Sequence, residues 1–459
     1  MIEHVHVIGM GGTGLSAIAK VLLESGYRVS GSDRQYSPLA QSVEAAGAQF
    51  YLGHRSENIA GADIVVRSSA VPDDNVEVQA AISQGIAVLK RADFLGRLLA
   101  GKEGIAVAGT HGKTTTTAMI AWMLIELGLD PTFIVGGTIT GLETNARAGK
   151  GQYFVIEADE YDRMFLGLNP KIAVVTNVEH DHPDCYPTPE DFYSAFRDFV
   201  ARLVPGGSLL ACGDHADTAQ VLSVAKQNQN PTFTYGISHL QNQYLAEEIR
   251  SNPEQGGYQF TLNRDGEKTI SLTLQVPGLH NVQNAVAALA VLDLLGLPLP
   301  ESARALESFR GTGRRFEKVG EAQGVTVISD YAHHPTEIQA TLSAARSRYP
   351  AREIWAVWQP HTYLRTKLMM KSFADSFQDA DHLLVTEVYP ARESIDPDFS
   401  SKQSVDAIHD PRASYVTSLG EAVDYLSAHL RSGDVLIVMS AGDADQVCTQ
   451  VLTKLSEAG

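Results

Sequence analysis

The sequence predicts an α/β protein with three domains in succession. Short β-branched runs that end in glycine or polar clusters alternate with helical stretches through most of the chain, which is typical of parallel sheets covered by helices. Its 459 residues exceed what one core normally holds, so several domains are expected. A composition of 44% hydrophobic and 20% charged residues allows each domain to bury a core of its own.

The first domain is expected at residues 1–100. The run HVHVIGMGGTG and the following LSAIAKVLLESG predict a strand, a glycine turn and a helix that ends at Gly26. The segment YRVSGSD predicts the second strand, and further units continue to about Leu99. The polar segment AGKEG at 100–104 then predicts a linker.

The second domain is expected at residues 101–310. It starts with a strand, a loop and a helix in IAVAGTHGKTTTT and continues through the strands FVIEAD and IAVVTN. Apolar and polar residues alternate in YQFTLNRDGEKTISLTLQV about Asp265–Gly266, which predicts an antiparallel hairpin. The run NVQNAVAALAVLDLLG predicts the helix that follows.

The third domain is expected at residues 311–459, after a boundary in GTGRRFE at 311–317. A strand followed by a polar loop recurs in four segments: VTVISDYAHHP, EIWAVWQPHTYLR, HLLVTEVYPARE and DVLIVMSAGD. The architecture resembles that of the first domain, although the sequences do not repeat.

The charge balance excludes some partners. The formal net charge is −18, and nucleic acid and anionic membranes both need a basic face, so neither is expected as a partner. No apolar run approaches the ~18 residues of a membrane span. The start, MIEHVHVIGM, lacks a secretion signal, and the three cysteines form no C-x-x-C pair. We therefore expect a soluble, cytoplasmic protein of unknown oligomeric state.

A phosphate-binding loop is the strongest local signal. Gly109–Thr115 (GTHGKTT) follows a predicted strand and opens a predicted helix, whose unpaired N–H groups and dipole attract phosphate. Lys113 would reach the outer phosphates of ATP, and Thr114 would bind Mg²⁺. The loop is shorter than the common form, because Val107 stands where a glycine is usual. A merely structural glycine turn is the alternative.

Two acidic clusters end later strands of the same domain. They are FVIEADEYD, with Glu157, and IAVVTNVEHDHPD, with His182. Because ligands of open α/β sheets lie beyond the carboxyl ends of the strands, these clusters are expected near the phosphate loop. Mg²⁺ prefers oxygen ligands, so Glu157 is the natural one. His182 is either a ligand or an imidazole that hydrogen bonds to one.

A second glycine loop stands near the start of the chain. Gly9-x-Gly11-x-x-Gly14, with Asp33 at the end of the next strand, matches the dinucleotide-binding pattern. This pattern suits an NAD(P)-dependent oxidoreductase or any other nucleotide diphosphate, and a tight structural turn is also compatible with it. Ser68 and Ser69 end another strand and either donate to a pyrophosphate or form an ordinary turn.

Together these motifs resemble the Mur ligase family over essentially the whole chain. The matching segments are GMGGTG, GTHGKTTTT, EADEYD, TNVEHDH, PGLHNVQNA, GTGRRFE, SDYAHHPTE, QPHTYLRT, EVYPARE and SAGD, in that order. The resemblance implies a Rossmann-like first domain, a central P-loop ATPase domain with a small antiparallel sheet, and a Rossmann-like third domain. It is strongest to the alanine-adding members, which implies ATP and Mg²⁺ as cofactors and UDP-N-acetylmuramate and L-alanine as substrates. The reaction would pass through an acyl phosphate, release ADP and phosphate, and start the peptide of peptidoglycan precursors.

The resemblance also assigns residues to sites. It implies that the UDP-sugar is held by Gly11, Gly12, Asp33, His54, Ser68, Ser69 and Arg91. The ATP phosphates would be held by Gly109, Thr110, His111, Gly112, Lys113, Thr114 and Thr115, and the adenine region by His280, Asn281 and Asn284. The metal would be served by Thr114, Glu157 and His182. The third domain would supply Arg315 and Asp330 to the phosphates and ribose, and Tyr331, His333 and Arg365 to the amino-acid pocket.

These residues have coherent chemical roles. Phosphoryl transfer needs positioning and charge neutralisation, which Lys113, the metal and Arg315 would supply; the alternative for Arg315 is a surface ion pair. Arg365 would bind the carboxylate of alanine. His333 would orient the incoming amine or accept its proton, and a hydrogen bond to the backbone is the alternative.

Two positions depart from the family, and several functions compete. Arg197 lies near the place of a lysine that some relatives carbamylate, and Thr362 stands where some alanine ligases have a second arginine. A murein peptide ligase, which adds a tripeptide to the same sugar nucleotide, is the nearest rival. Folylpolyglutamate synthetases lack the first glycine-loop domain. An oxidoreductase and a non-enzymatic nucleotide switch are the rivals from other classes.

Overall fold

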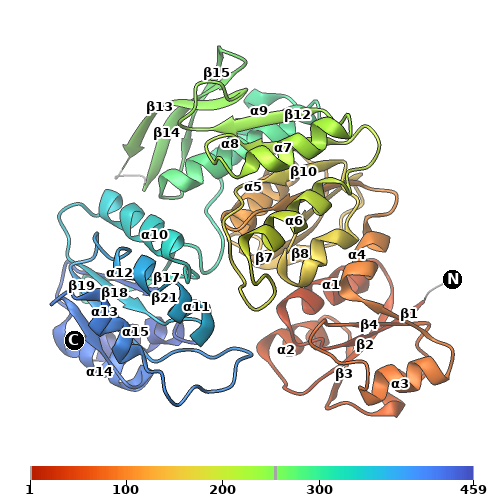
Figure 1. Ribbon diagram of the computed structural model, residues 1–459, viewed down its shortest axis with the longest axis horizontal. Helices are drawn as coiled ribbons and strands as arrows, with labels where there is room; N and C mark the ends of the chain where they lie inside the picture. Colours follow the sequence, from red (N-terminus) through yellow and green to blue (C-terminus); the bar gives the residue numbers. More distant parts are fainter. Residues whose placement is uncertain (1–2, 253–255, 458–459) are drawn as a thin grey trace.

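The computed structural model describes residues 3–252 and 256–457. Figure 1 shows three α/β bodies that follow one another along the chain, from red at the N-terminal end to blue at the C-terminal end. The described residues form three sheets, one in each body. This is the fold class that the sequence predicts, while the domain limits at 100 and 310 remain a prediction.

The first sheet is parallel throughout, in the order β3-β2-β1-β4-β5. The glycine loop joins the central strand β1 to α1. Its elements are β1 (His4–Ile8), α1 (Thr13–Glu24), β2 (Arg28–Asp33), α2 (Pro38–Ala45), β3 (Gln49–Leu52), η1 (Ser56–Ile59), β4 (Ile64–Arg67), α3 (Val76–Ser83), β5 (Ala87–Lys90) and α4 (Arg91–Leu99).

The second sheet has ten strands, in the order β15-β14-β13-β12-β11-β10-β6-β9-β7-β8. Its elements are β6 (Glu103–Ala108), α5 (Lys113–Glu126), β7 (Thr132–Ile139), β8 (Thr144–Arg147), β9 (Tyr153–Glu157), η2 (Tyr161–Gly167), β10 (Ile172–Val175), α6 (Pro189–Val200), β11 (Ser208–Cys212), α7 (Thr218–Gln227), β12 (Thr232–Gly236), β13 (Tyr244–Asn252), β14 (Gly257–Arg264), β15 (Glu267–Leu274), α8 (Leu279–Leu294) and α9 (Leu299–Glu307).

The antiparallel hairpin lies where the sequence predicts it. Strands β14 and β15 pair across the turn at Asp265–Gly266. The hairpin is not a separate small sheet, however. Strand β13 pairs parallel with β12 and antiparallel with β14, so the hairpin extends the central sheet at one edge.

The third sheet has the order β16-β17-β21-β18-β19-β20, with β16 antiparallel and the remaining strands parallel. Its elements are β16 (Glu317–Ala322), β17 (Val325–Asp330), α10 (Pro335–Arg348), β18 (Ile354–Trp358), α11 (Tyr363–Leu368), α12 (Met370–Ala374), β19 (His382–Val385), α13 (Ser401–Ile408), β20 (Ala413–Tyr415), α14 (Leu419–His429), β21 (Val435–Met439) and α15 (Gln446–Glu457).

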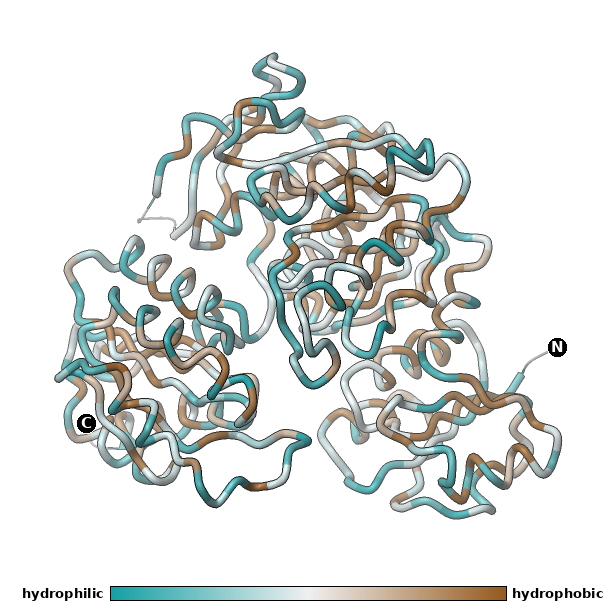
Figure 2. The backbone as a smooth tube through the Cα atoms, in the orientation of Figure 1, coloured by the Kyte–Doolittle hydropathy of each residue, from teal (hydrophilic) through white to brown (hydrophobic). Residues whose placement is uncertain are grey.

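The apolar cores show how the bodies are joined. One cluster contains residues of β1, α1 and α4 together with residues of β6, β9 and α6, so the first two bodies share a core. Helix α1 packs on β7 and β8, and α4 packs on η2. The third body has clusters of its own on the two faces of its sheet. Figure 2 shows the brown apolar segments inside each body and teal hydrophilic segments around them.

None of the helices in the described part of the chain is both long and apolar enough to span a membrane.

Candidate active site

The phosphate loop connects β6 to the N-terminus of α5, as the sequence predicts. Gly109 and Gly112 have φ angles of 141° and 82°, which L side chains rarely adopt. A Cβ atom on Gly109 would lie 1.9 Å from Thr176 Oγ1, and one on Gly112 would lie 2.5 Å from Asn284 Oδ1. The loop can therefore close against β10 and α8 only with glycine at both positions.

Lys113 is held between the loop and an acidic side chain. Its Nζ donates to the carbonyl oxygens of Gly109 (2.6 Å) and Thr110 (3.2 Å) and to Glu160 Oε1 (2.9 Å). Burial lowers the pKa of Lys113, but Glu160 and Glu157 outweigh it and raise the pKa above its ordinary value. The ammonium is charged at neutral pH and lies at the N-terminus of α5, where phosphates bind.

Glu157 lies beside Thr114, as a shared metal site requires. Thr114 Oγ1 donates to Glu157 Oε1 (3.1 Å), and the N–H of Gly136 donates to Oε2 (2.7 Å). Burial raises the pKa of Glu157, although Lys113 opposes this. A partly buried carboxylate and a hydroxyl form an oxygen-rich donor set that fits Mg²⁺.

His182 lies beside Glu160, the carboxylate that also contacts Lys113. Its Nε2 lies 3.4 Å from Glu160 Oε1 and 3.8 Å from Asp181 Oδ2. Glu160 is almost fully buried, and its Oε2 has no hydrogen-bond partner. Sequence reasoning placed Glu160 in an acidic cluster without assigning it a role. An orphaned buried carboxylate oxygen makes it a further candidate to contact a cation.

A cavity of about 470 Å³ lies between the central and third bodies. Its lining includes His111, Gly112, Thr114, Thr115, His280, Asn281, Asn284, Arg315 and Asp330, all expected at the ATP site. His215, Asp217 and Gln283 also line it. Gln283 belongs to the PGLHNVQNA motif but was assigned no role, and His215 and Asp217 lie outside the motifs. Burial, with Arg315 nearby, lowers the pKa of His280 to about 4, so this imidazole is neutral at pH 7.

Arg315 and Asp330 enter the cavity from the third body. The Arg315 guanidinium lies 5.2 Å from the ring centre of Tyr331 and 3.6 Å from Glu337. It is therefore held by the site, although the partial exposure of its side chain leaves room for a ligand. Burial raises the pKa of Asp330 to about 6, against the effect of Arg315 and of the N–H groups of Phe316 and Ala332.

His333 has a defined tautomer. Its Nδ1 lies 2.9 Å from the carbonyl oxygen of Tyr331, which can only accept, so the ring proton is on Nδ1. Burial lowers the pKa of His333 to about 4, against Glu337, which raises it. The ring is therefore neutral, and the lone pair on Nε2 is able to accept a proton.

His111 of the phosphate loop bridges two bodies. Its Nε2 contacts Glu179 (2.9 Å) on the central body, and its Nδ1 contacts Glu337 (3.2 Å) on α10. Burial lowers the pKa of His111, but hydrogen bonds to both carboxylates raise it to about 9. Glu179 also accepts from Thr336 (2.9 Å). Neither carboxylate was singled out as a site residue, because their pairing depends on the docking of two bodies.

This cluster also resembles a metal site. Within the described residues, His111, Glu179 and His334 place one candidate ligand atom each within 4.8 Å of the others. However, His111 carries two protons at neutral pH, and His334 Nδ1 caps α10 by accepting from the N–H of Thr336. The arrangement is that of an ion-pair network between bodies.

Arg365 has a partner that sequence reasoning did not foresee. Its Nε and Nη2 donate to Asp181 Oδ1 at 3.0 and 2.8 Å, and both side chains are buried. Its Nη1 lies 3.0 Å from His361 Nδ1. The pair joins α11 of the third body to the segment after β10. One edge of the guanidinium is thus used between bodies, and the other faces His361.

The first glycine loop is fixed by Asp33 and Ser37. Asp33 Oδ2 accepts from the N–H of Gly11 (2.9 Å), and Ser37 Oγ donates to the Gly11 carbonyl (3.0 Å). Gly12 is the N-cap of α1. Ser69 is exposed, whereas Ser68 lies against Gly9. Gly11, Gly12, Asp33, Ser68 and Ser69, which were expected at the UDP-sugar site, gather at the carboxyl edge of the first sheet, and Ser37 is an additional contact that was not predicted.

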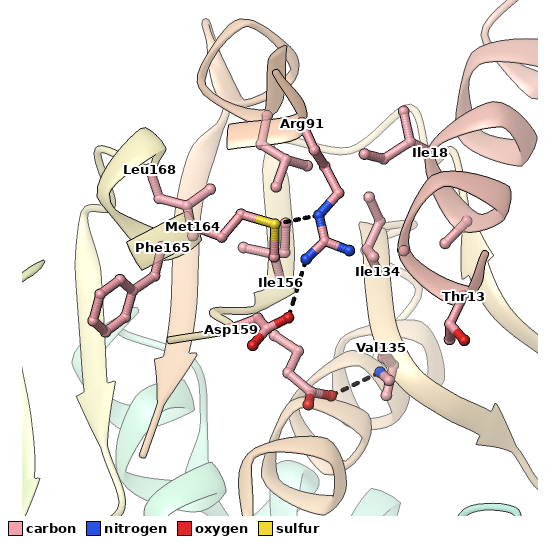
Figure 3. A pocket seen from close by; sticks show the side chains of 15 residues that line it. Thr13, Ile18, Arg91, Ile134, Val135, Ile156, Asp159, Met164, Phe165 and Leu168 are labelled. Atoms are coloured by element: carbon pink, nitrogen blue, oxygen red, sulfur yellow. Dashed lines mark hydrogen bonds and ion pairs between the residues drawn. The ribbon is translucent and has the colours of Figure 1, made fainter. Parts of the chain in front are cut away.

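Arg91 lies between the first two bodies rather than within the first one. It donates to Asp159 Oδ2 (3.0 Å) and contacts the Met164 sulfur. Figure 3 shows its guanidinium between these two side chains, with Thr13 of α1 on the opposite side of the pocket. This pocket, of about 140 Å³, is lined by Thr13 and Gly14 of the first body and by Gly136 and Glu157 of the central body, among others.

The two departures from the family also have a structural account. Arg197 on α6 donates to Gln220 (2.7 Å) and Glu190 (2.5 Å). Thr362 has a φ angle of 66° and caps α11 by accepting from the N–H of Arg365. Thr362 therefore serves the backbone.

Three family models match successive parts of the chain. The model described as "Mur ligase family, catalytic domain" matches residues 4–103, "Mur ligase middle domain" matches residues 107–292, and "Mur ligase, glutamate ligase domain" matches residues 314–442.

Curated relatives match over the full length. The UDP-N-acetylmuramate–L-alanine ligase of Geobacter sp. (strain M21) is 42% identical, and the alignment covers 100% of this chain and 98% of the relative. The enzyme of the same name from Pelotomaculum thermopropionicum is 41% identical over 99% of this chain and 98% of the relative.

Solved structures agree with these matches. The UDP-N-acetylmuramate–alanine ligase of Thermotoga maritima superposes with a TM-score of 0.84 at 28% identity, covering 99% of this chain and 100% of that one. A murein peptide ligase from Psychrobacter arcticus gives a TM-score of 0.73 at 27% identity, covering 99% and 98%.

Proposed function

Because the chain belongs to the Mur ligase family, we propose that it joins L-alanine to the carboxylate of UDP-N-acetylmuramate with conversion of ATP to ADP and phosphate. The observation that carries this proposal is the pocket between the first two bodies. It is lined by Thr13 and Gly14 of the first glycine loop and by Glu157 of the phosphate-loop site. A UDP-sugar bound at the first loop can thus extend its carboxylate toward the terminal phosphate of ATP.

The first half of the reaction uses residues of the central body. A carboxylate oxygen of the sugar attacks the γ-phosphorus of ATP, so an acyl phosphate forms and ADP leaves. Lys113 and Arg315 neutralise charge on the phosphates. Thr114, Glu157 and His182 are the proposed Mg²⁺ ligands, and the ion would shield the phosphate oxygens from the attacking carboxylate.

The second half uses residues of the third body. The alanine amine attacks the acyl carbon, phosphate leaves with the electrons of the carbon–oxygen bond, and an amide forms. The amine must lose a proton, and the Nε2 lone pair of the neutral His333 suits it to accept one. Tyr331 packs against His333 at the proposed amino-acid pocket. Arg365 would bind the carboxylate of alanine through the edge that faces His361.

The remaining proposed contacts hold the two nucleotides. Gly11, Gly12, Asp33, His54, Ser68 and Ser69 would hold the UDP part, with Arg91 nearer the sugar. Gly109 to Thr115, together with His280, Asn281, Asn284 and Asp330, would hold ATP. Since both nucleotides are substrates of cytoplasmic metabolism, we place the reaction in the cytoplasm.

The rival functions are less well supported. The similarity to the alanine ligase structure exceeds that to the murein peptide ligase structure, by TM-scores of 0.84 against 0.73. The curated matches described above are alanine ligases, and neither they nor the family models favour an oxidoreductase.

An ADP-release panel tests the proposal. ADP should form only when UDP-N-acetylmuramate, Mg²⁺ and L-alanine are all present. Release with the tripeptide L-alanyl-γ-D-glutamyl-meso-diaminopimelate but not with L-alanine would favour the murein peptide ligase. If none of the amino acids or peptides tested supports ADP release, the ligase assignment is overturned.

A further inference from the structure

Glu77 is a fully buried carboxylate that no step of the proposed reaction uses. It lies in the first turn of α3, and its side chain is 0% exposed. Oε2 accepts from Ser32 Oγ (2.5 Å) and lies 3.3 Å from His54 Nδ1 and 3.6 Å from His6 Nε2. Oε1 accepts from Asn58 Nδ2 (2.5 Å) and the N–H of Arg55 (3.3 Å).

The charge of Glu77 is stabilised by hydrogen bonds. Burial raises its pKa, but the nearby His6 and hydrogen bonds from Ser32 and Asn58 lower the pKa to about 2, so the group is ionised at neutral pH. Among the interactions of the described residues, none joins Glu77 to a lysine or arginine side chain. A buried carboxylate without such a partner is costly, and an apolar side chain at this place would stabilise the fold more simply.

Ser32, a partner of Glu77, is hydrogen bonded to the first glycine loop. The carbonyl oxygen of Ser32 accepts from the N–H groups of Gly9 (2.8 Å) and Met10 (3.1 Å). The next residue, Asp33, accepts from the N–H of Gly11. Movement of Ser32 would therefore move the loop itself.

Glu77 also joins three separate segments at the edge of the sheet. Ser32 is the penultimate residue of β2, His54 follows β3, and α3 follows the turn that contains Ser68 and Ser69 after β4. Each segment carries residues proposed to hold the UDP part. One carboxylate thus fixes the relative positions of three segments that are far apart in the sequence.

We propose that Glu77 is a positioning residue for the UDP-sugar site: it does not touch the ligand, but holds Ser32 and His54, and through them the glycine loop, in the geometry that binds the diphosphate. This inference rests on the proposed function, because that function places the UDP part at the first loop.

The Glu77→Gln variant tests the inference in the full-length protein. It retains the size of the side chain but places an amide N–H₂ among donors, so at least one partner must turn away. The Kd for UDP-N-acetylmuramate, measured by titration calorimetry, should rise about tenfold, as expected for the loss of one hydrogen bond to a charged group. At saturating UDP-sugar, kcat and the KM values for ATP and L-alanine should change less than about twofold.

Glu57→Gln is the matched control. Glu57 is on η1 of the same body, but it is exposed, and its side chain accepts a hydrogen bond from Ser56 Oγ. Its substitution should leave the Kd for the UDP-sugar unchanged.

The outcomes separate the two proposals. A wild-type protein that releases no ADP with UDP-N-acetylmuramate and L-alanine overturns the proposed function. An active wild type together with a Glu77→Gln variant that unfolds at a lower temperature but binds UDP-sugar normally shows that Glu77 is only structural. If Glu77→Gln does not fold, Ser32→Ala removes one partner and leaves the carboxylate; unchanged affinity in that variant would also overturn the inference.

Discussion

At the scale of single residues, the site is a set of charges that are held in place by other charges. Lys113 contacts loop carbonyls and Glu160, and His111 lies between Glu179 and Glu337. Such arrangements keep groups ionised in a buried site, where they act on a phosphate without reorganisation.

Removal of the Lys113 ammonium should separate chemistry from sugar binding. In Lys113→Ala, kcat should fall by about 100-fold or more, the size seen when one stabilising donor is lost. The Kd for UDP-N-acetylmuramate should change less than about twofold, because the proposed UDP site lies on the first body. Kinetics and calorimetry on the same variant check both values. An equal loss of UDP-sugar affinity would mean that the two sites have been interchanged.

The His111 bridge predicts a pH dependence of stability. Its pKa is raised from 6.5 in the unfolded chain to about 9 in the fold. The stabilisation is therefore fully present below pH 6.5, declines as pH rises from 6.5 to 9, and is lost above 9. It amounts to about 3 kcal/mol at most. Between pH 6 and 9.5, calorimetry should show that the free energy of unfolding falls more steeply with pH for the wild type than for His111→Gln. Parallel pH dependences of the two proteins would contradict the bridge.

At the scale of elements, local sequence signals predict the site best where one strand and one loop suffice. The phosphate loop is found where its glycines indicate it, and so is the hairpin at Asp265–Gly266, because each depends on backbone angles that few residues adopt. Glu337 could not be predicted in this way. Its partners His111 and Arg315 lie on different segments, and only docking of α10 brings them together.

Arg365 is a second residue whose partner could not be predicted from the local sequence. The motif correctly indicates a cation near the active site, but it carries no information about Asp181, which lies 184 residues away in sequence. The extension of the central sheet by β13 was likewise missed, because alternation predicts a hairpin without indicating its neighbour.

The hairpin turn provides a test at this scale. Asp265 and Gly266 both have positive φ angles, 51° and 87°. Gly266→Val should destabilise the hairpin by about 1–2 kcal/mol, because a β-branched residue is strained in this conformation. Amide hydrogen exchange should become faster in β14 and β15. The rate of ADP release should stay within about twofold of the wild-type rate, because the turn does not line the ATP cavity.

Asp265→Asn is the control for that strain. Asparagine tolerates the left-handed region, so it should change stability by less than about 0.5 kcal/mol. A comparable destabilisation by both variants would show that the φ angle of Gly266 is not the cause.

At the scale of the whole molecule, the two junctions between bodies differ in kind. The first two bodies share an apolar core, whereas the third meets the phosphate-loop region through polar contacts such as Arg365–Asp181 and His111–Glu337. Polar contacts between domains are more easily exchanged for water than a shared core. The third body is therefore the one expected to move.

Solution scattering tests this movement. ATP and UDP-N-acetylmuramate together should reduce the radius of gyration of the wild type. In Asp181→Asn the buried Arg365 loses its charged partner, so the same ligands should compact the protein less. An unchanged radius in the wild type would argue against closure by the third body, and equal compaction of both proteins would argue against a role for this pair.

The side chain of Arg197 predicts that activity does not depend on dissolved bicarbonate. Some relatives carry near this position a lysine that takes up carbon dioxide, but a guanidinium that already donates to Glu190 and Gln220 does not form a carbamate. The rate of ADP release should therefore be the same in buffer stripped of bicarbonate as in buffer saturated with it. An enzyme that depended on such a group would lose activity on degassing and regain it when carbonate is restored.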